Sequence, residues 1–393
     1  MYGWVPNNMH HPTARGETDY VKVYFPTVGS MRRASRPPKF GGTPLAVHED
    51  KVTADTKFMD DNNLVPSGWV VVRGRQAENK VSHCRLEVEC TMSQMTPDDR
   101  PDIAPLMVAF VDIECVSDLM RFPDASLRKD EICQIGVNYW RVGTPKESAV
   151  KVLYVSSAGC GPVRDAYVMR FESERELLRG FRSSCLVDVD PDVIATYNGF
   201  GFDLPYLWAR AKLLDVDDFL YFDRIIARQC PAGVKELSSS ALGSNDMFII
   251  DMFGRTNLDI FHWIKAREKL ESYKLDAVGE HFLGQKKIEM DYKHLFKMAR
   301  GTPGQMARVG VYCLQDCYLL VLLCIRLQIF AANVEMSRVC HTPMEMLVTR
   351  GQQIKVINQL VHYGHRMERR SDGHGGYILN TPAVYSGGPG DSY

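Results

Sequence analysis

The segment "LMVAFVDIEC", residues 106–115, constrains the fold more than any other part of the sequence. Its nearly unbroken apolar run is typical of a central strand that is buried on both faces. Asp112 and Glu114 interrupt the end of this run, and on a strand they point to the same face. A charged pair beside a buried strand is costly unless a cation or another partner compensates it. The segment therefore predicts a buried strand with two carboxylates at its end.

The segments that follow alternate between strand and helix patterns. Apolar runs at 131–140, 151–157 and 192–198 predict strands, and the amphipathic pattern of 172–189 predicts a helix. From Asn257 onward helices dominate. Strands that alternate with helices indicate an α/β sheet with helices on its faces.

The 393 residues indicate about two or three domains. We expect a loose leader at 1–17, followed by a small mostly-β domain at 18–105 and an α/β domain at 106–332. A helical segment at 333–371 and a Gly-rich end at 372–393 complete the sequence. Within the α/β domain, the turn-rich stretch 230–255 predicts an extended hairpin.

The composition excludes some classes of protein. The formal net charge is −1, which argues against a protein that coats DNA but leaves room for an enzyme with a local basic groove. The eleven cysteines contain no C-x-x-C pair, so the usual structural zinc spacing is absent. Cys313, Cys317 and Cys324 lie in an apolar helical stretch and are expected to be packing residues.

An intracellular, reducing location fits the scattered cysteines. The N-terminal residues contain no apolar signal core. The apolar run that starts at Cys317 contains Arg326, so we expect a buried helix and no membrane partner.

Two further motifs carry carboxylates. In "YNGFGFDLP", residues 197–205, Asp203 precedes Leu204 and Pro205. It could be a helix N-cap or a metal ligand, and the local sequence favours neither. In "VYCLQDCYLL", Tyr312 and Asp316 lie four residues apart, so they share one face of a helix. Asp316 could equally lie on a partly exposed face.

Taken together, the motifs supply four carboxylates and a tyrosine hydroxyl. Hard oxygen ligands in this number suit Mg²⁺ or Mn²⁺ and suit zinc poorly. Two such ions about 3.5–4 Å apart can activate a water and stabilise a leaving oxygen in phosphodiester cleavage.

The three motifs resemble the three exonuclease motifs of the proofreading domain of family B DNA polymerases, in the variant with a tyrosine four residues before the last aspartate. The resemblance to the eukaryotic delta-type catalytic subunit runs in order from about Lys57 to Leu360. It implies a ribonuclease H-like domain, a mixed sheet with flanking helices, preceded by a small mostly-β N-terminal domain. It also implies a two-metal 3′→5′ exodeoxyribonuclease with Mg²⁺ or Mn²⁺ as cofactor, acting in DNA replication.

Roles for individual residues follow from this resemblance. Asp112 would bridge the two ions, Glu114 and Asp316 would hold the ion on the water side, and Asp203 would serve the second ion. Tyr312 would orient the water. Asn198 and Phe202 would contact the 3′-terminal nucleotide. Asp259, in "NLDIF", also matches an acidic position of the family, and either a structural or a catalytic role fits it.

The polymerase motifs of the family's palm, "D-x-x-S-L-Y-P-S" and "D-T-D", do not occur in this sequence. Two alternative readings are a catalytically silent scaffold, as in family members whose exonuclease has decayed, and a free-standing nuclease of the same class that acts on RNA. The resemblance implies the single-stranded 3′ end of a DNA primer as substrate. The rest of a polymerase, a sliding clamp and accessory subunits are candidate partners. The location would be nuclear for a cellular protein, and the host nucleus or a cytoplasmic replication site for a viral one.

Overall fold

The computed structural model describes residues 52–157, 159–239, 243–285 and 290–370, with short pieces of the first 51 residues. Those pieces are residues 2–4, 18–20, 23, 25, 27–34, 39–40 and 43–44. Most of the expected leader and all of the expected Gly-rich end, 372–393, lie outside the described residues. The chain forms two compact units, which we call the sheet unit and the terminal unit. The sheet unit comprises Gln76–Glu89 and Asp102–Ala332, and the terminal unit comprises Met1–Arg75, Cys90–Pro101 and Asn333–Tyr393.

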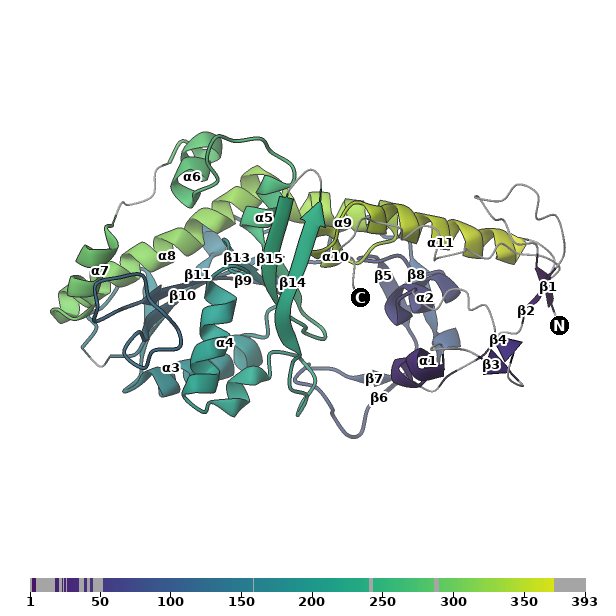
Figure 1. Ribbon diagram of the computed structural model, residues 1–393, viewed down its shortest axis with the longest axis horizontal. Coiled ribbons are helices and arrows are strands. Elements are labelled where there is room, and N and C mark those ends of the chain that lie inside the picture. The colour runs from purple at the N-terminus through teal and green to yellow at the C-terminus, as the bar shows by residue number, and fades with distance from the viewer. Residues whose placement is uncertain are drawn as a thin grey trace. The chain divides into compact units, whose positions relative to one another are not determined.

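A mixed six-stranded sheet forms the centre of the sheet unit (Figure 1). Its strands are β9 (Met107–Cys115), β10 (Ile132–Arg141), β11 (Val150–Val155), β12 (Ala166–Arg170), β13 (Val193–Thr196) and β16 (Thr256–Asp259). Their order is β12-β11-β10-β9-β13-β16. β9 pairs antiparallel with β10 and parallel with β13, so it lies inside the sheet. Val108 to Val111 are at most 2% exposed, which confirms the predicted buried strand.

Two helices cover opposite faces of this sheet. On β10, Gln134 donates through Nε2 to the carbonyl oxygen of Met306 in α8 (Pro303–Arg326) at 2.9 Å. Ile135, the next residue, pairs with Tyr154 of β11, whose ring lies edge-on against Phe181 of α3 (Glu174–Phe181). Because side chains alternate along a strand, α8 covers one face and α3 the other.

The remaining elements of the sheet unit follow in chain order. The longer ones are the π-helix Arg182–Val189, α4 (Asp203–Leu213), β14 (Ala232–Ser239), β15 (Gly243–Ile250), α5 (Ile260–Lys265), α6 (Leu275–Leu283) and α7 (Tyr292–Ala299). The short ones are β7 (Val88–Glu89) and the 3₁₀ turns Lys146–Ser148 and Asp217–Leu220. β14 and β15 pair antiparallel over their whole length, so the hairpin predicted within 230–255 is confirmed (Figure 1).

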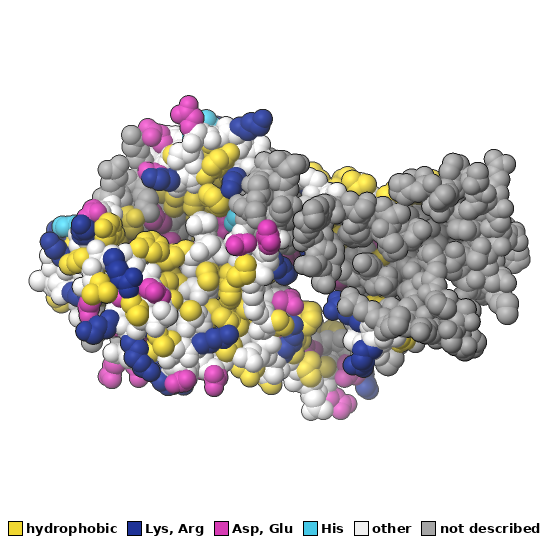
Figure 2. All heavy atoms as spheres, in the orientation of Figure 1, with side chains coloured by type: hydrophobic (Ala, Val, Ile, Leu, Met, Phe, Trp, Pro, Cys, Tyr) yellow, Lys and Arg dark blue, Asp and Glu magenta, His cyan; other side chains and the backbone are white. Residues whose placement is uncertain are grey.

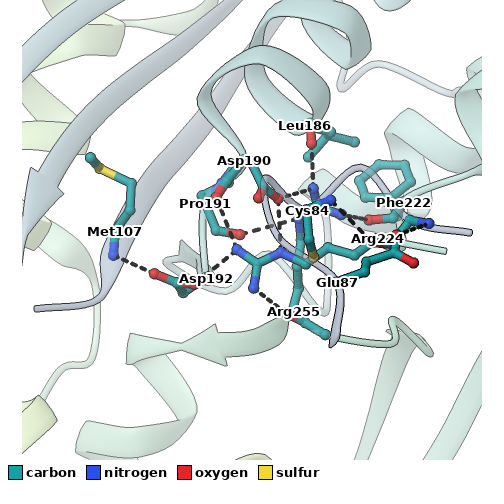
Figure 3. A network of polar contacts seen from close by, with 12 residues as sticks. Cys84, Glu87, Met107, Leu186, Asp190, Pro191, Asp192, Phe222, Arg224 and Arg255 are labelled. Carbon is teal, nitrogen blue, oxygen red and sulfur yellow. Dashed lines mark hydrogen bonds and ion pairs between the residues drawn. The ribbon is translucent and has the colours of Figure 1, made fainter. Parts of the chain in front are cut away.

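A charge network fixes the end of the sheet at which β9 begins (Figure 3). Asp192 accepts the backbone N–H of Met107 at 2.7 Å and a hydrogen bond from Arg224 Nη2 at 2.8 Å. Asp190 accepts from Arg224 Nε and from Arg255 Nη2, each at 2.8 Å. Arg255 is 5% exposed and also donates to the carbonyl oxygen of Pro191. Because both arginines meet carboxylate and carbonyl oxygens, the network holds the starts of β9, β13 and β16 together.

The terminal unit combines short strands with helices. Its strands are β1 (Tyr2–Trp4), β2 (Thr18–Tyr20), β3 (Lys39–Phe40), β4 (Thr43–Pro44), β5 (Trp69–Val72) and β8 (Met95–Asp98), and β6 (Arg75–Gln76) lies at its boundary. Its helices are α1 (Val28–Ala34), α2 (Ala54–Asp61), the 3₁₀ turn Met92–Gln94, α10 (Met346–Thr349) and α11 (Gln353–Arg370). α9 (Ile329–Cys340) crosses from one unit into the other along the chain. A hydrogen bond from His362 to Asp60 joins α11 to α2.

Among the described residues, α8 is the one helix that is long and apolar enough to cross a membrane. About two thirds of its apolar window, 67%, is buried inside the protein. Its Cys313, Cys317 and Cys324 are all buried, as expected of packing residues. The core helix predicted from the run at Cys317 is thus part of α8.

Candidate active site

The two carboxylates of β9 face helix α8. In the antiparallel register with β10, Asp112 lies opposite Gly136 and Glu114 lies opposite Gln134. Gln134 points to α8, because its side chain bonds to the backbone of that helix. Paired residues of neighbouring strands share a face, so Asp112 and Glu114 also point towards α8.

Gly136 allows α8 to lie close to the sheet at this point. A Cβ atom at Gly136 would lie 2.6 Å from the Sγ of Cys313, which is too close for any real contact. The Sγ of Cys317 donates to the carbonyl oxygen of Gly136 at 3.3 Å. The Sγ of Cys313 lies 3.6 Å from the carbonyl oxygen of Asp112, within the longer reach of a thiol donor. Any larger residue in place of Gly136 would push the helix away from β9.

Tyr312 and Asp316 flank these cysteines on α8. Asp316 is 3% exposed, so the hypothesis of a partly exposed face is wrong. Tyr312 is half-buried and packs against a core cluster that includes Val116 and Leu314. The helical spacing predicted from the sequence therefore presents the carboxylate and the phenol on the side of α8 that meets the sheet.

Asp203 is the first residue of α4, and it is 4% exposed. The preceding residue, Phe202, occupies the N-cap position, so the N-cap hypothesis for Asp203 is wrong. Oδ1 of Asp203 accepts the backbone N–H of Ile113 at 3.2 Å. This N–H is available because the pairing of β13 with β9 ends at Ala195 and Phe110. The end of one strand pair thus brings a third carboxylate to β9.

The carboxylates interact strongly with one another. Burial raises the pKa of Asp112 well above its usual value, and the nearby charges of Asp203, Asp316 and Glu114 raise it further. Burial likewise raises the pKa of Asp203 to about 7, against the lowering effect of its bond from Ile113. Carboxylates that cannot all ionise unaided are typical of a cation site.

Asp259 supports the loop that leads to Asp203. Its carboxylate accepts the backbone N–H groups of Asn198 at 2.9 Å and of Phe200 at 3.0 Å. It also caps α5 by accepting the N–H of Phe261 at 3.0 Å. Burial raises its pKa to about 6, although these three bonds favour the charged form. Asp259 therefore holds the backbone of the loop that contains Asn198 and Phe200 in place.

The same loop carries Asn198 and Phe202, which the family resemblance predicts to contact the 3′-terminal nucleotide. Asn198 is exposed and has a φ of 58°, and its carbonyl oxygen accepts the N–H of Phe202 at 3.1 Å. Gly199 follows, and a Cβ atom there would lie 2.3 Å from the Oγ1 of Thr196. This crowding requires glycine in the turn.

An aromatic contact next to this loop did not follow from the sequence. The ring of Phe122, 72% exposed, lies with its centroid 5.2 Å from that of Phe202. Phe202 in turn contacts Tyr206 at 5.3 Å. The sequence signal was a lone phenylalanine in a polar stretch, which does not say which distant ring it meets.

The β14–β15 hairpin is hydrogen-bonded to the loop that precedes Asp203. The N–H of Phe248 in β15 donates to the carbonyl oxygen of Phe200 at 2.9 Å. Met247, Ile249 and Ile250 are buried, whereas Val234 of β14 is 65% exposed. The base of the hairpin is thus fixed beside the loop that holds Asp203.

The residues present fit hard divalent cations. Asp112, Glu114 and Cys313 each offer a ligand atom, and these atoms lie within 4.8 Å of one another. Burial raises the pKa of the Cys313 thiol, so it stays protonated and is a poor ligand at neutral pH. Carboxylate oxygens from Asp112 and Glu114, with Asp203 and Asp316 in electrostatic contact with Asp112, remain as donors. This donor set favours Mg²⁺ or Mn²⁺.

Comparison with known proteins identifies what the chain resembles. Residues 45–278 match the family "DNA polymerase family B, exonuclease domain". The DNA polymerase delta catalytic subunit of Mesocricetus auratus is 33% identical over 353 residues, which are 88% of this chain and 32% of that protein. The same subunit from Arabidopsis thaliana is 31% identical over 356 residues, 88% of this chain and 32% of its own. The chain thus spans about a third of the length of these relatives.

A solved structure shows the same fold. The family B DNA polymerase from the hyperthermophilic archaeon Pyrobaculum calidifontis superposes with a TM-score of 0.62 at 23% identity. The match covers 89% of this chain and 39% of that one. The mixed sheet with flanking helices, expected from the sequence as a ribonuclease H-like domain, is therefore confirmed.

Proposed function

Because the chain belongs to the exonuclease-domain family of the family B DNA polymerases, we propose that it carries a 3′→5′ proofreading exonuclease. The substrate would be the 3′ end of a DNA strand, and the larger protein would be a replicative polymerase of the delta type. The observation that carries the proposal is the convergence of Asp112, Glu114, Asp203 and Asp316: burial raises the pKa of Asp112, and the charges of the three others raise it further.

Four carboxylates would hold the ions of the site. Asp112 would lie between the ions and contact both, because the charges of Glu114, Asp203 and Asp316 all reach it. Glu114 and Asp316 would hold the ion on the water side, and Asp203, at the start of α4, would hold the other. Two Mg²⁺ or Mn²⁺ ions, when bound, supply an activated water and charge stabilisation for the leaving 3′ oxygen.

Tyr312 would act on the water rather than on an ion. It lies one helical turn before Asp316, and its ring packs against the core cluster. A packed ring keeps the phenolic hydroxyl in one position, from which it would orient the water for attack.

The aromatic rings beside the site fit a single-stranded end. Bases that are not paired stack on exposed aromatic rings, and each stack contributes roughly 1–3 kcal/mol. Phe122 and Phe202 offer such a surface, and Asn198 is exposed beside it. Acidic and basic side chains are intermingled on the face of the sheet unit seen in Figure 2.

Location and partners follow from the relatives. The polymerase delta relatives come from eukaryotes, such as the hamster and Arabidopsis, which supports a nuclear place for a cellular form. The partners would be DNA, the remainder of the polymerase, and a clamp or accessory subunits.

The test is degradation of a 5′-labelled oligonucleotide by the purified chain. We expect Mg²⁺-dependent shortening of single-stranded DNA from its 3′ end, one nucleotide at a time, and weak action on RNA of the same sequence. Preference for RNA would identify the free-standing nuclease instead. No shortening of either strand with any divalent ion would identify a silent scaffold.

A further inference from the structure

We propose that Asp60, His341 and His362 form a second metal site, for a zinc-class divalent ion, in the terminal unit. Each residue offers one ligand atom, and these atoms lie within 4.8 Å of one another. The three residues come from α2, the turn after α9, and α11. None of them belongs to the exonuclease site, so this proposal does not depend on the proposed function.

The three ligand atoms of this site favour some metal ions over others. Two imidazole nitrogens and one carboxylate oxygen suit Zn²⁺, Ni²⁺ or Cu²⁺, whereas Mg²⁺ and Ca²⁺ prefer oxygen ligands alone. The carboxylates of the candidate exonuclease site offer oxygen ligands alone and therefore suit Mg²⁺. The two sites should therefore prefer different ions in the same solution.

One imidazole ring must turn before both histidines can bind the same ion, because an ion bound to a ring nitrogen lies in the plane of that ring. The rings of His341 and His362 are stacked, with centroids 3.4 Å apart and an angle of 11° between their planes. Nδ1 of His362 lies 2.9 Å from Oδ1 of Asp60. Ligand atoms around a tetrahedral Zn²⁺ lie roughly 3.3 Å apart, given bonds of about 2.0–2.1 Å. The His362–Asp60 pair would open by only a few tenths of an ångström as the ion replaces the shared proton.

The ligands are held by their surroundings. His341 adopts a φ of 50°. The next residue, Thr342, is fixed from both sides: its N–H donates to the carbonyl oxygen of Ser337 at 3.1 Å, and its Oγ1 accepts from Asn358 at 3.1 Å. Asp60 is 3% exposed, and a buried carboxylate is stabilised by an ion as well as by a hydrogen bond.

A pocket gives the site access to solvent. It measures about 370 Å³ and is lined by both histidines together with Val339, Gln359, Leu360 and Tyr363, among others. A zinc ion with three protein ligands normally completes its shell with water, and the pocket has room for one.

An ion here would stabilise the terminal unit. Asp60 and His362 are separated by 302 positions in the sequence. A bond between such distant segments restricts the unfolded chain, and the free energy of binding adds to the free energy of unfolding. The ion would therefore link α2 to α11, while its fourth position stays open to water.

The test is Zn²⁺ binding to the full chain in an Asp112→Ala background, which weakens competition from the exonuclease carboxylates. After chelator treatment, calorimetric titration with ZnCl₂ in the presence of Mg²⁺ should give one equivalent bound, with a rise in Tm. His341→Ala and His362→Ala should each lower the affinity at least about 100-fold, more than loss of an outer-shell partner typically does.

His294→Ala is the matched control, since His294 lies exposed on α7 of the sheet unit. It should keep the full stoichiometry and the full rise in Tm. Asp60→Asn keeps the shape of the side chain, so it tests the carboxylate even where an alanine variant fails to fold. Absence of a stoichiometric equivalent in the parent, or equal affinity in the parent and both histidine variants, would overturn the proposal.

Discussion

Each carboxylate of the candidate exonuclease site occupies a position where a negative charge is costly. Asp203 and Asp316 are at most 4% exposed, and Glu114 is 8% exposed. Evolution of stability alone would place apolar side chains here. The cost is explained if ions are bound, because they stabilise the charged forms of the same groups.

The raised pKa of Asp203 predicts how the ion-free protein responds to pH. In the unfolded chain an aspartate has a pKa of about 3.9, whereas in the folded chain that of Asp203 is about 7. The folded state therefore binds the proton more tightly. Protonated Asp203 therefore contributes to the free energy of unfolding at low pH, and this contribution is lost as the pH rises from about 4 through 7.

In EDTA, we expect Asp203→Asn to raise the Tm relative to the parent more at pH 7.5 than at pH 5. Mg²⁺ should raise the Tm of the parent at pH 7.5 and should do less for the variant. Parallel Tm curves of parent and variant across this pH range would contradict the assignment.

Tyr312→Phe should separate a catalytic hydroxyl from a packing ring. The variant keeps the contact with the core cluster, so its Tm should match that of the parent. A hydrogen-bonding group that orients a reactant typically contributes about 10²-fold. We expect the single-turnover excision rate to fall by about that factor. Equal rates would leave Tyr312 as a packing residue.

At the scale of residues, the sequence pattern predicted which carboxylates share a face, but not the hydrogen bonds that support them. The spacing in "VDIEC" and "VYCLQDC" placed Asp112, Glu114, Tyr312 and Asp316 correctly on shared faces, because a strand and a helix have fixed periods. Asp259 stayed undecided, because two of its three hydrogen bonds go to backbone N–H groups of a loop about 60 positions earlier. No local period encodes such a contact.

At the scale of elements, the site depends on how closely α8 approaches β9 and β10. Gly136 is what permits the approach, since a side chain there would meet Cys313. The sequence showed a glycine within an apolar strand but could not show the helix, from over 170 residues later, that needs the space.

Gly136→Ala should therefore lower both stability and activity. Overpacking of this kind typically costs about 1–3 kcal/mol, measured by urea denaturation, and it would move Asp316 away from Asp112. Gly304→Ala is the control, since a Cβ atom there meets nothing within 4 Å. Comparable stability of the two variants would mean that the helix adjusts without cost.

The β14–β15 hairpin is predicted to act on duplex ends. Its base is bonded to the site loop through Phe248 and Phe200, and its exposed Val234 is apolar. Replacing residues 234–246 by a short Gly-Ser turn should slow excision from mismatched duplex ends. Excision from single-stranded DNA should be unaffected. A similar loss on both substrates would point to damage of the loop rather than to strand separation.

At the scale of the whole molecule, two chemically distinct ion sites would serve two different units. The sheet unit would hold the oxygen-rich exonuclease site, and the terminal unit would hold the histidine site. The candidate ligands of the first site could be found from the sequence, because they fall within motifs. The second could not, because Asp60, His341 and His362 have no metal-ligand spacing and meet only through tertiary packing.

The central claim is that the clustered carboxylates perform two-metal hydrolysis at a DNA 3′ end. Its most direct test is the single-turnover excision rate of Asp112→Ala on single-stranded DNA with Mg²⁺. Glu147→Ala serves as the control, because this carboxylate is exposed in the turn Lys146–Ser148 and is not one of the four carboxylates of the candidate site. We predict a fall of at least ~10³-fold for Asp112→Ala, which is about 4 kcal/mol of barrier. The control should retain the parent rate, and the parent should be inactive in EDTA. A parent-like rate for Asp112→Ala, or full activity in EDTA, would contradict the account.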